Sequence, residues 1–171
     1  FQRDRFDHYS NFARIGEGSL GGKGRGLAFI DNMVKHHAEF EEFENATVAI
    51  PKTVVLCTDI FDEFMDSNNL YQIALSDVDD DVILKAFLRA RLPERLMDDF
   101  LTFLDVVRSP IAIRSSSLLE DSHYQPFAGI YSTYMIPYME DKNEMLRMLG
   151  DAIKGVYASV YYKDSKAYMQ A

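Results

Sequence analysis

The sequence is poor in cysteine, in positive charge and in long apolar runs, and each shortage excludes a class of protein. Cys57 is the single cysteine among 171 residues, so an internal disulfide framework is excluded. Lysine and arginine number 18 against 27 aspartate and glutamate residues, and the net charge of −9 argues against a general nucleic-acid or membrane-surface binder. No apolar run approaches the roughly 18–20 residues that cross a bilayer. We therefore expect a cytoplasmic protein that binds neither nucleic acid nor membrane.

The remaining composition is that of an ordinary globular domain. Hydrophobic residues make up 47% of the chain and charged residues 26%. The charged start, Phe1-Gln2-Arg3-Asp4-Arg5, has no initiator methionine and no apolar core of a signal peptide. We expect residues 1–171 to form a single domain, and expect the chain to be an incomplete fragment of a longer protein.

Short β-patterns alternate with helical ones along the chain. Strands are expected at residues 12–15, at 48–57 with an interruption at Pro51, at 111–113 and at 131–136. Apolar residues at helical spacing predict a first helix that begins at Leu27 and shares an apolar face among Leu27, Ile30, Met33 and Val34. Further helices are expected after Thr58 as N-cap, over about 82–107 with the second part starting at Pro93, and from Asp141 to the chain end. Asp141 with Glu144 resembles a capping box. This mixture predicts an α/β or α+β domain.

Six of the nine glycines lie in the eleven residues 16–26, which also hold Lys23. Such density predicts backbone with positive φ or a close approach by another group. Where the loop enters the helix, exposed amides and the helix dipole favour an anion, and Lys23 adds a mobile positive charge suited to phosphate. A glycine-rich turn with a merely solvated lysine is the alternative that this loop alone leaves open.

The best-known phosphate loops do not fit this cluster. The Walker A pattern fails because Glu17 stands at its first glycine and Gly24 at its Ser/Thr position. The G-x-G-x-x-G pattern of residues 16–21 lacks the acid at the end of the next strand that dinucleotide binding needs. The protein-kinase pattern fails because Pro51 displaces Lys52 by one residue, and neither His-Arg-Asp nor Asp-Phe-Gly occurs.

A second group of polar residues surrounds Arg114. This arginine directly follows the apolar run 111–113, so we expect its guanidinium at a strand end, where ligands of α/β sheets commonly bind. A guanidinium binds phosphate in bidentate fashion, and the hydroxyls of 115–117 follow it. Glu120-Asp121 could instead pair with the arginine or hold a metal ion. No His/Cys/Asp/Glu spacing is typical of a zinc site, so no metal ligand is assigned.

Three sequence blocks occur together, in one order. The first, residues 20–28, reads Leu-Gly-Gly-Lys-Gly-Arg-Gly-Leu-Ala; the second starts at Ile50-Pro51 and includes Val54-Val55-Leu56-Cys57-Thr58, Phe61 and Phe64. The third reads Ile-Ala-Ile-Arg-Ser-Ser-Ser at 111–117, followed by Glu120-Asp121 and Phe127-Ala128-Gly129. Over about residues 12–171 the chain thereby resembles the N-terminal nucleotide-binding domain of the phosphoenolpyruvate synthase and pyruvate, phosphate dikinase family.

The resemblance implies an ATP-grasp-like fold of which this chain is the N-terminal part. It implies that Lys23 and Arg114 contact the phosphates of ATP, with Arg114 in the catalytic role. It also implies nucleotide-binding roles for Gly21, Gly22, Gly24, Ser115, Ser116, Glu120, Gly129 and Thr133. Mg²⁺ is implied as well, with acidic ligands in a downstream half that lies outside this chain.

In that family the β-phosphoryl group of ATP passes to a histidine on a swivelling domain of the same parent chain, and from there to pyruvate, which becomes phosphoenolpyruvate. The implied partners are therefore a nucleotide, the phosphohistidine domain and a second copy of the parent in a homodimer. The fragment alone is expected to be inactive.

One stretch departs from the family pattern. After Phe-Ala-Gly the family usually has Gln, an acid and Thr, whereas Ile130, Tyr131, Ser132 and Thr133 stand here. Two alternatives therefore stay open: the same histidine relay with an antibiotic or a glucan as acceptor, or a non-catalytic nucleotide-sensing or interaction module.

Overall fold

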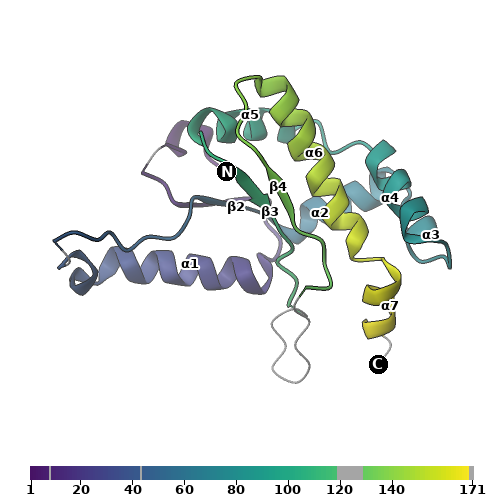
Figure 1. Cartoon of the computed structure of the whole chain (residues 1–171), viewed down its shortest axis with the longest axis horizontal. Coiled ribbons are helices and arrows are strands. Elements are labelled where there is room, and N and C mark those ends of the chain that lie inside the picture. The colour runs from purple at the N-terminus through teal and green to yellow at the C-terminus, as the bar shows by residue number, and fades with distance from the viewer. Residues whose placement is uncertain (8, 43, 119–128, 170–171) are drawn as a thin grey trace.

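The computed structural model describes residues 1–7, 9–42, 44–118 and 129–169, and it has the predicted mixed α/β class (Figure 1). Its strands are β1 (Phe12–Ile15), β2 (Thr53–Leu56), β3 (Ile111–Ile113) and β4 (Tyr134–Ile136). Its helices are α1 (Gly21–His36), α2 (Thr58–Ser67), α3 (Tyr71–Ala74), α4 (Asp80–Arg89), α5 (Leu96–Val106), α6 (Lys142–Ser159) and α7 (Lys163–Met169). Short 3-10 turns occupy Arg3–Arg5 and Ala38–Glu41.

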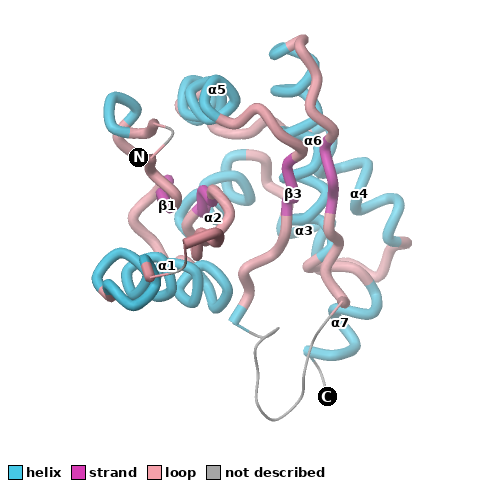
Figure 2. Tube along the Cα trace, turned by 60° about the vertical axis from the view of Figure 1, so that its left-hand side comes forward, coloured by secondary structure: helices cyan, strands magenta, loops and turns pink. Residues whose placement is uncertain are grey.

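The strands form two separate pairs. β1 and β2 are parallel, with Ile15 beside Leu56, and the chain runs through α1 between them. β3 and β4 are antiparallel, with Ile113 beside Tyr134. In both views α5 and α1 lie on opposite sides of the strand pairs (Figures 1 and 2). Because β1 and β2 are parallel, their carboxyl ends lie at one edge, so the segments that follow them are neighbours.

One apolar core joins the two strand pairs. Ile15 of β1, Ile111 of β3 and Ile136 of β4 are each at most 8% exposed and share a cluster with α2, α5 and α6. A second cluster packs α2 and α4 against the end of α6, around Phe64 and Phe87. Each such side chain stabilises the fold by roughly 1.5–3 kcal/mol relative to an exposed one. The shared core holds the strand ends in fixed relation to one another.

Helix α1 begins at Gly21, six residues before the expected start at Leu27. Of the four residues predicted to share its apolar face, Ile30 is 46% exposed and Leu27, Met33 and Val34 are partly buried. The buried residues of this helix are Gly21 and Gly24, both in its first turn. The helix is therefore held to the domain by its N-terminus, where polar contacts replace apolar packing.

Three other predicted boundaries move. Strand β2 begins only at Thr53, two residues past Pro51, and β4 begins at Tyr134 rather than at residue 131. Helix α5 begins at Leu96, whose N–H donates to the carbonyl of Pro93 at 3.0 Å, so the proline lies in the turn that leads into the helix. The expected strand at 12–15 and the one at 111–113 are confirmed.

Helix α6 starts as predicted and ends earlier. The carboxylate of Asp141 accepts the N–H groups of Asn143 and Glu144 at 2.9 and 3.2 Å, which confirms the N-cap. The helix was expected to run to the chain end, but it stops at Ser159 and α7 follows as a separate helix. The buried hydroxyl of Ser159 donates to the carbonyl of Val156 and accepts the N–H of Ser132. A serine hydroxyl bonded to the preceding turn weakens a helix and often bends it, and this bond lies at the residue where α6 ends.

None of the described helices is both long and apolar enough to cross a membrane.

Candidate functional site

The candidate site lies where three strand ends meet the start of α1. The glycine-rich loop, residues 16–20, follows β1, and the first residues of α2 follow β2 directly. Residues 114–117 follow β3. The C-terminal edges of strands are where α/β domains commonly bind their ligands.

Helix α2 holds one side of the glycine-rich loop. The carboxylate of Asp59 accepts the N–H groups of Glu17 and Gly18 at 3.0 and 2.9 Å. The hydroxyl of Thr58 accepts the N–H of Ser19 at 3.0 Å. The prediction that Thr58 caps α2 is therefore wrong: its side chain binds the loop, and Cys57 occupies the N-cap position. The hydrogen bond from Glu17 is the main reason why the pKa of Asp59 is lowered.

The contact between α2 and the loop explains why two of the loop positions are glycine, and the explanation needs no bound ligand. Gly16 has φ +99°, and a Cβ added to it would lie 2.4 Å from the Asp59 carboxylate. A Cβ on Gly18 would lie 2.5 Å from the Thr58 hydroxyl. The glycine pattern at 16–21 therefore lets α2 approach the loop, and the loop amides bind protein oxygens.

Ser116 holds the other side, at the start of α1. Its carbonyl accepts the N–H of Gly22 at 2.9 Å, and its hydroxyl accepts the N–H of Gly24 at 2.8 Å. The same hydroxyl donates to the carbonyl of Leu20 at 2.7 Å, while the N–H of Gly21 donates to the Ser19 hydroxyl at 3.2 Å. The expectation that the first-turn amides are exposed to an anion is thus wrong for Gly21, Gly22 and Gly24.

The structure brings together the two backbone segments that carry Lys23 and Arg114. Lys23 stands between the two glycines bound by Ser116, and Arg114 lies two residues before that serine. Lys23 is partly buried and Arg114 is exposed directly after β3. Both basic residues therefore lie on segments that Ser116 joins.

The other predicted residues are distributed around this centre. Ser115 follows Arg114 and is partly buried; its hydroxyl accepts the N–H of Ser117 at 3.1 Å. Thr133 directly precedes Tyr134, the partner of Ile113, so the register places Thr133 at the same end of the strand pair as Arg114.

Two further predicted positions stand apart from that register. Gly129 is an exposed turn residue with φ +87° and open space around its Cβ position, so the backbone conformation explains its glycine. Glu120 lies outside the described residues.

Sequence reasoning missed Thr58 and Asp59 as residues of this region. Their signal was a pair of short polar side chains directly after an expected strand, at a helix start. Two other charged residues, Arg14 and Arg25, also reach the loop: Arg14 pairs with Glu17 at 3.0 Å, and Arg25 donates to the Ser19 hydroxyl at 3.4 Å. The described residues hold no cluster of three or more His, Cys, Asp or Glu side chains that could bind a metal ion.

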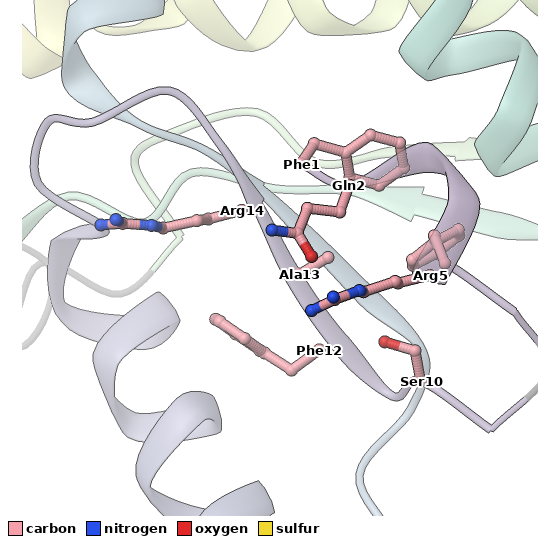
Figure 3. A pocket seen from close by; sticks show the side chains of 8 residues that line it. Phe1, Gln2, Arg5, Ser10, Phe12, Ala13 and Arg14 are labelled. Carbon is pink, nitrogen blue, oxygen red and sulfur yellow. The ribbon is translucent and has the colours of Figure 1, made fainter.

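A separate pocket of about 240 Å³ lies beside β1 (Figure 3). Its lining consists of Phe1, Gln2, Arg5, Phe6, Ser10, Phe12, Ala13 and Arg14. None of the predicted site residues lines it. Arg14 extends from this pocket toward the loop that precedes α1, in keeping with its ion pair to Glu17 (Figure 3).

Fold and site together define an α/β domain that brings a lysine-bearing glycine-rich helix start to an arginine-bearing strand end. Residues 17–171 match the family described as "Pyruvate phosphate dikinase, AMP/ATP-binding domain". The chain belongs to this family. The matched range begins at the first loop residue bound by Asp59 and includes all the predicted site residues. Comparison with curated proteins and with solved structures gives no match.

Proposed function

We propose that this chain is the ATP-binding part of a phosphotransferase that passes the β-phosphoryl group of ATP, through a histidine on another domain of the same protein, to pyruvate. The product of that reaction is phosphoenolpyruvate. Family membership supports ATP binding by a dikinase-type enzyme. The relay and the acceptor are parts of the proposal.

The observation that carries the proposal is the double attachment of Ser116 to both neighbours of Lys23. Through it, the lysine-bearing turn is fixed beside the end of β3, from which Arg114 emerges. A lysine and an arginine on two joined segments provide the cations that a triphosphate would bind.

The proposed roles follow from the chemistry of each side chain. Lys23 acts as a mobile point charge on the phosphates, and the planar guanidinium of Arg114 binds phosphate oxygens in bidentate fashion. Both stabilise the charge that develops on the phosphoryl group during transfer. The first-turn amides of α1 are used to hold the backbone, so the side chains carry the recognition. Mg²⁺ would neutralise further phosphate charge, with ligands from a part of the protein outside this chain.

A nucleotide-sensing module is the second candidate, and one observation favours it. Tyr131 stands where the family usually has a polar residue, and its side chain is only 5% exposed. A side chain buried in this way supports the fold and leaves the phosphate side of the site with fewer polar groups. A sensor would retain ATP binding and lack transfer.

The test uses the complete protein that carries this domain, with Mg²⁺ and ATP labelled at the β- or the γ-phosphate. Acid-labile label on the protein from the β-position alone supports the relay through a phosphohistidine. Binding of ATP with label from neither position supports the sensor. Label from the γ-position alone contradicts the dikinase proposal, since an ordinary kinase step transfers that group.

A further inference from the structure

Ser116 makes three hydrogen bonds of ordinary length to the start of α1. Its carbonyl accepts the N–H of Gly22 at 2.9 Å, its hydroxyl accepts the N–H of Gly24 at 2.8 Å, and its hydroxyl donates to the carbonyl of Leu20 at 2.7 Å. The two residues in the hydroxyl bonds lie 92 and 96 positions away along the chain. Leu20, the N-cap residue of α1, makes no side-chain cap bond, so the segment after β3 caps this helix together with Ser19.

The fit between the two segments is tight. A Cβ added to Gly21, which has φ +72°, would lie 1.6 Å from the carbonyl oxygen of Ser116. A Cβ on Gly24 would lie 3.3 Å from the Ser116 hydroxyl and 3.3 Å from a methyl group of Val55. Glycine at these positions lets the first turn of α1 lie directly against the backbone of Ser116. Hydrogen-bond partners and glycines thus specify one arrangement of the two segments.

The consequence for Lys23 comes from its position between the two bound amides. A residue whose neighbours on both sides are bonded to one serine has its backbone fixed relative to that serine. Arg114 lies two residues before Ser116 and directly after β3, so its backbone is fixed to the same point. The buried residues of helix α1, Gly21 and Gly24, both lie at this attachment to Ser116.

We propose that Ser116 is a positioning residue: it acts through Lys23, setting the distance between the lysine and Arg114, and it has no essential contact with the nucleotide. This inference rests on the proposed ATP site and deepens it. It changes the role assigned to Ser116 by the sequence motif from nucleotide contact to attachment of α1. The hydroxyl already donates its single proton to Leu20 and accepts one N–H, which leaves one lone pair.

A double-mutant cycle on the full chain tests this role, with ATP binding measured by isothermal titration calorimetry. Ser116→Ala removes the two hydroxyl bonds and keeps the carbonyl bond to Gly22, so the domain still folds. We expect about a tenfold weaker affinity for ATP in this variant, and a change below twofold when the same substitution is made in Lys23→Ala. Equal losses in both backgrounds would show that Ser116 acts on the nucleotide independently of Lys23 and would overturn the proposal.

Ser76→Ala is the matched control. The Ser76 hydroxyl also donates to a backbone carbonyl, that of Ile73 at 2.7 Å, at the end of α3 and outside the site. We expect its ATP affinity to equal that of the wild type. An equal loss in both serine variants would mean that any lost hydroxyl bond weakens binding, and the positioning role would be rejected.

Amide hydrogen exchange separates this inference from the proposed function. If the wild-type chain does not bind ATP, the nucleotide assignment fails while the attachment can still be measured. Ser116→Ala should then speed exchange at Gly24 at least tenfold relative to the Ser76→Ala chain. Unchanged exchange at Gly24 would overturn the attachment by Ser116 whether or not ATP binds.

Discussion

The carboxylate of Asp59 accepts the backbone N–H of Gly18 at 2.9 Å and so ties the start of α2 to the glycine-rich loop, 41 residues earlier in the chain. The same carboxylate accepts the N–H of Glu17 at 3.0 Å. An aspartate therefore occupies amides that a phosphate would use in other glycine-rich loops. Because Asp59 occupies these amides, the loop serves as a structural support. The side chains of the turn that follows are then the groups left to bind an anion.

Replacing Asp59 by Asn should lower the stability of the domain in a pH-dependent way. The amide side chain offers one acceptor oxygen where the carboxylate offers two, so one loop N–H loses its partner. We expect a loss of about 1–2 kcal/mol at pH 7, measured by urea unfolding. The pKa of Asp59 is lowered in the folded state, so its stabilising effect is present above the ordinary aspartate pKa and is lost as pH falls below about 4. The difference between wild type and Asp59→Asn should shrink from pH 7 to pH 3.

Asp62 provides the control on the same helix. Its side chain is exposed, and Asp62→Asn should change the free energy of unfolding by less than about 0.5 kcal/mol. A constant difference between the Asp59→Asn and wild-type proteins over the whole pH range would contradict the role given to the charge.

Two glycines of α1 should respond in opposite directions to alanine. Gly21 has φ +72°, and its added Cβ would lie 1.6 Å from the Ser116 carbonyl oxygen, whereas a Cβ on Gly26 meets nothing within 4 Å. Gly21→Ala should cost about 3 kcal/mol of unfolding free energy, and Gly26→Ala should add about 0.5–1 kcal/mol through helix propensity. Thermal unfolding of the two variants checks both signs. Similar stability for the two proteins would mean that α1 starts later, as its sequence suggests.

This difference shows where sequence reasoning succeeds and where it ends. Strands β1 and β3 are predictable to the residue because short apolar runs stand between polar and glycine-rich segments. The start of α1 is not, since glycines disfavour a helix locally and the compensating bonds come from Ser116, far away in the sequence. The end of α6 likewise coincides with a distant contact, the bond from the N–H of Ser132 to the hydroxyl of Ser159. Local propensity contains neither contact.

The candidate site follows the same rule. Lys23 and Arg114 are recognisable from motifs because each motif is contiguous in the chain. The residues that hold those motifs in place, Asp59 and Ser116, act across 41 and 92 residues, so the local sequence does not show which groups they bind. Charge and residue type thus predict what a site binds, while the positioning of its groups depends on tertiary contacts.

Tyr157 has a buried hydroxyl whose removal should not destabilise the protein. Among the described residues this hydroxyl has no hydrogen-bond partner, while its ring packs on Phe61 and Phe64 at centroid distances of 4.9 and 5.5 Å. Burial raises the pKa of Tyr157, so the group stays neutral. Tyr157→Phe removes the buried polar atom and keeps the ring, and we expect unchanged stability or a gain of up to about 1 kcal/mol in urea unfolding. Tyr157→Leu should lose about 2 kcal/mol or more because aromatic packing is lost. A clear loss in Tyr157→Phe would reveal a partner for the hydroxyl.

Removing either cation of the candidate site should slow phosphoryl transfer in the complete protein. Lys23→Ala and Arg114→Ala should each cost about 2–4 kcal/mol of transition-state stabilisation, because each removes one electrostatic donor from the developing charge. Lys35→Ala and Arg147→Ala are matched controls, since Lys35 pairs with Asp31 on the far part of α1 and Arg147 pairs with Asp151 on the surface of α6. Single-turnover rates of β-phosphoryl transfer from labelled ATP provide the measurement. Rates within threefold of wild type for both site variants would remove Lys23 and Arg114 from the site, whereas a loss confined to these two and absent from both controls would confirm their roles.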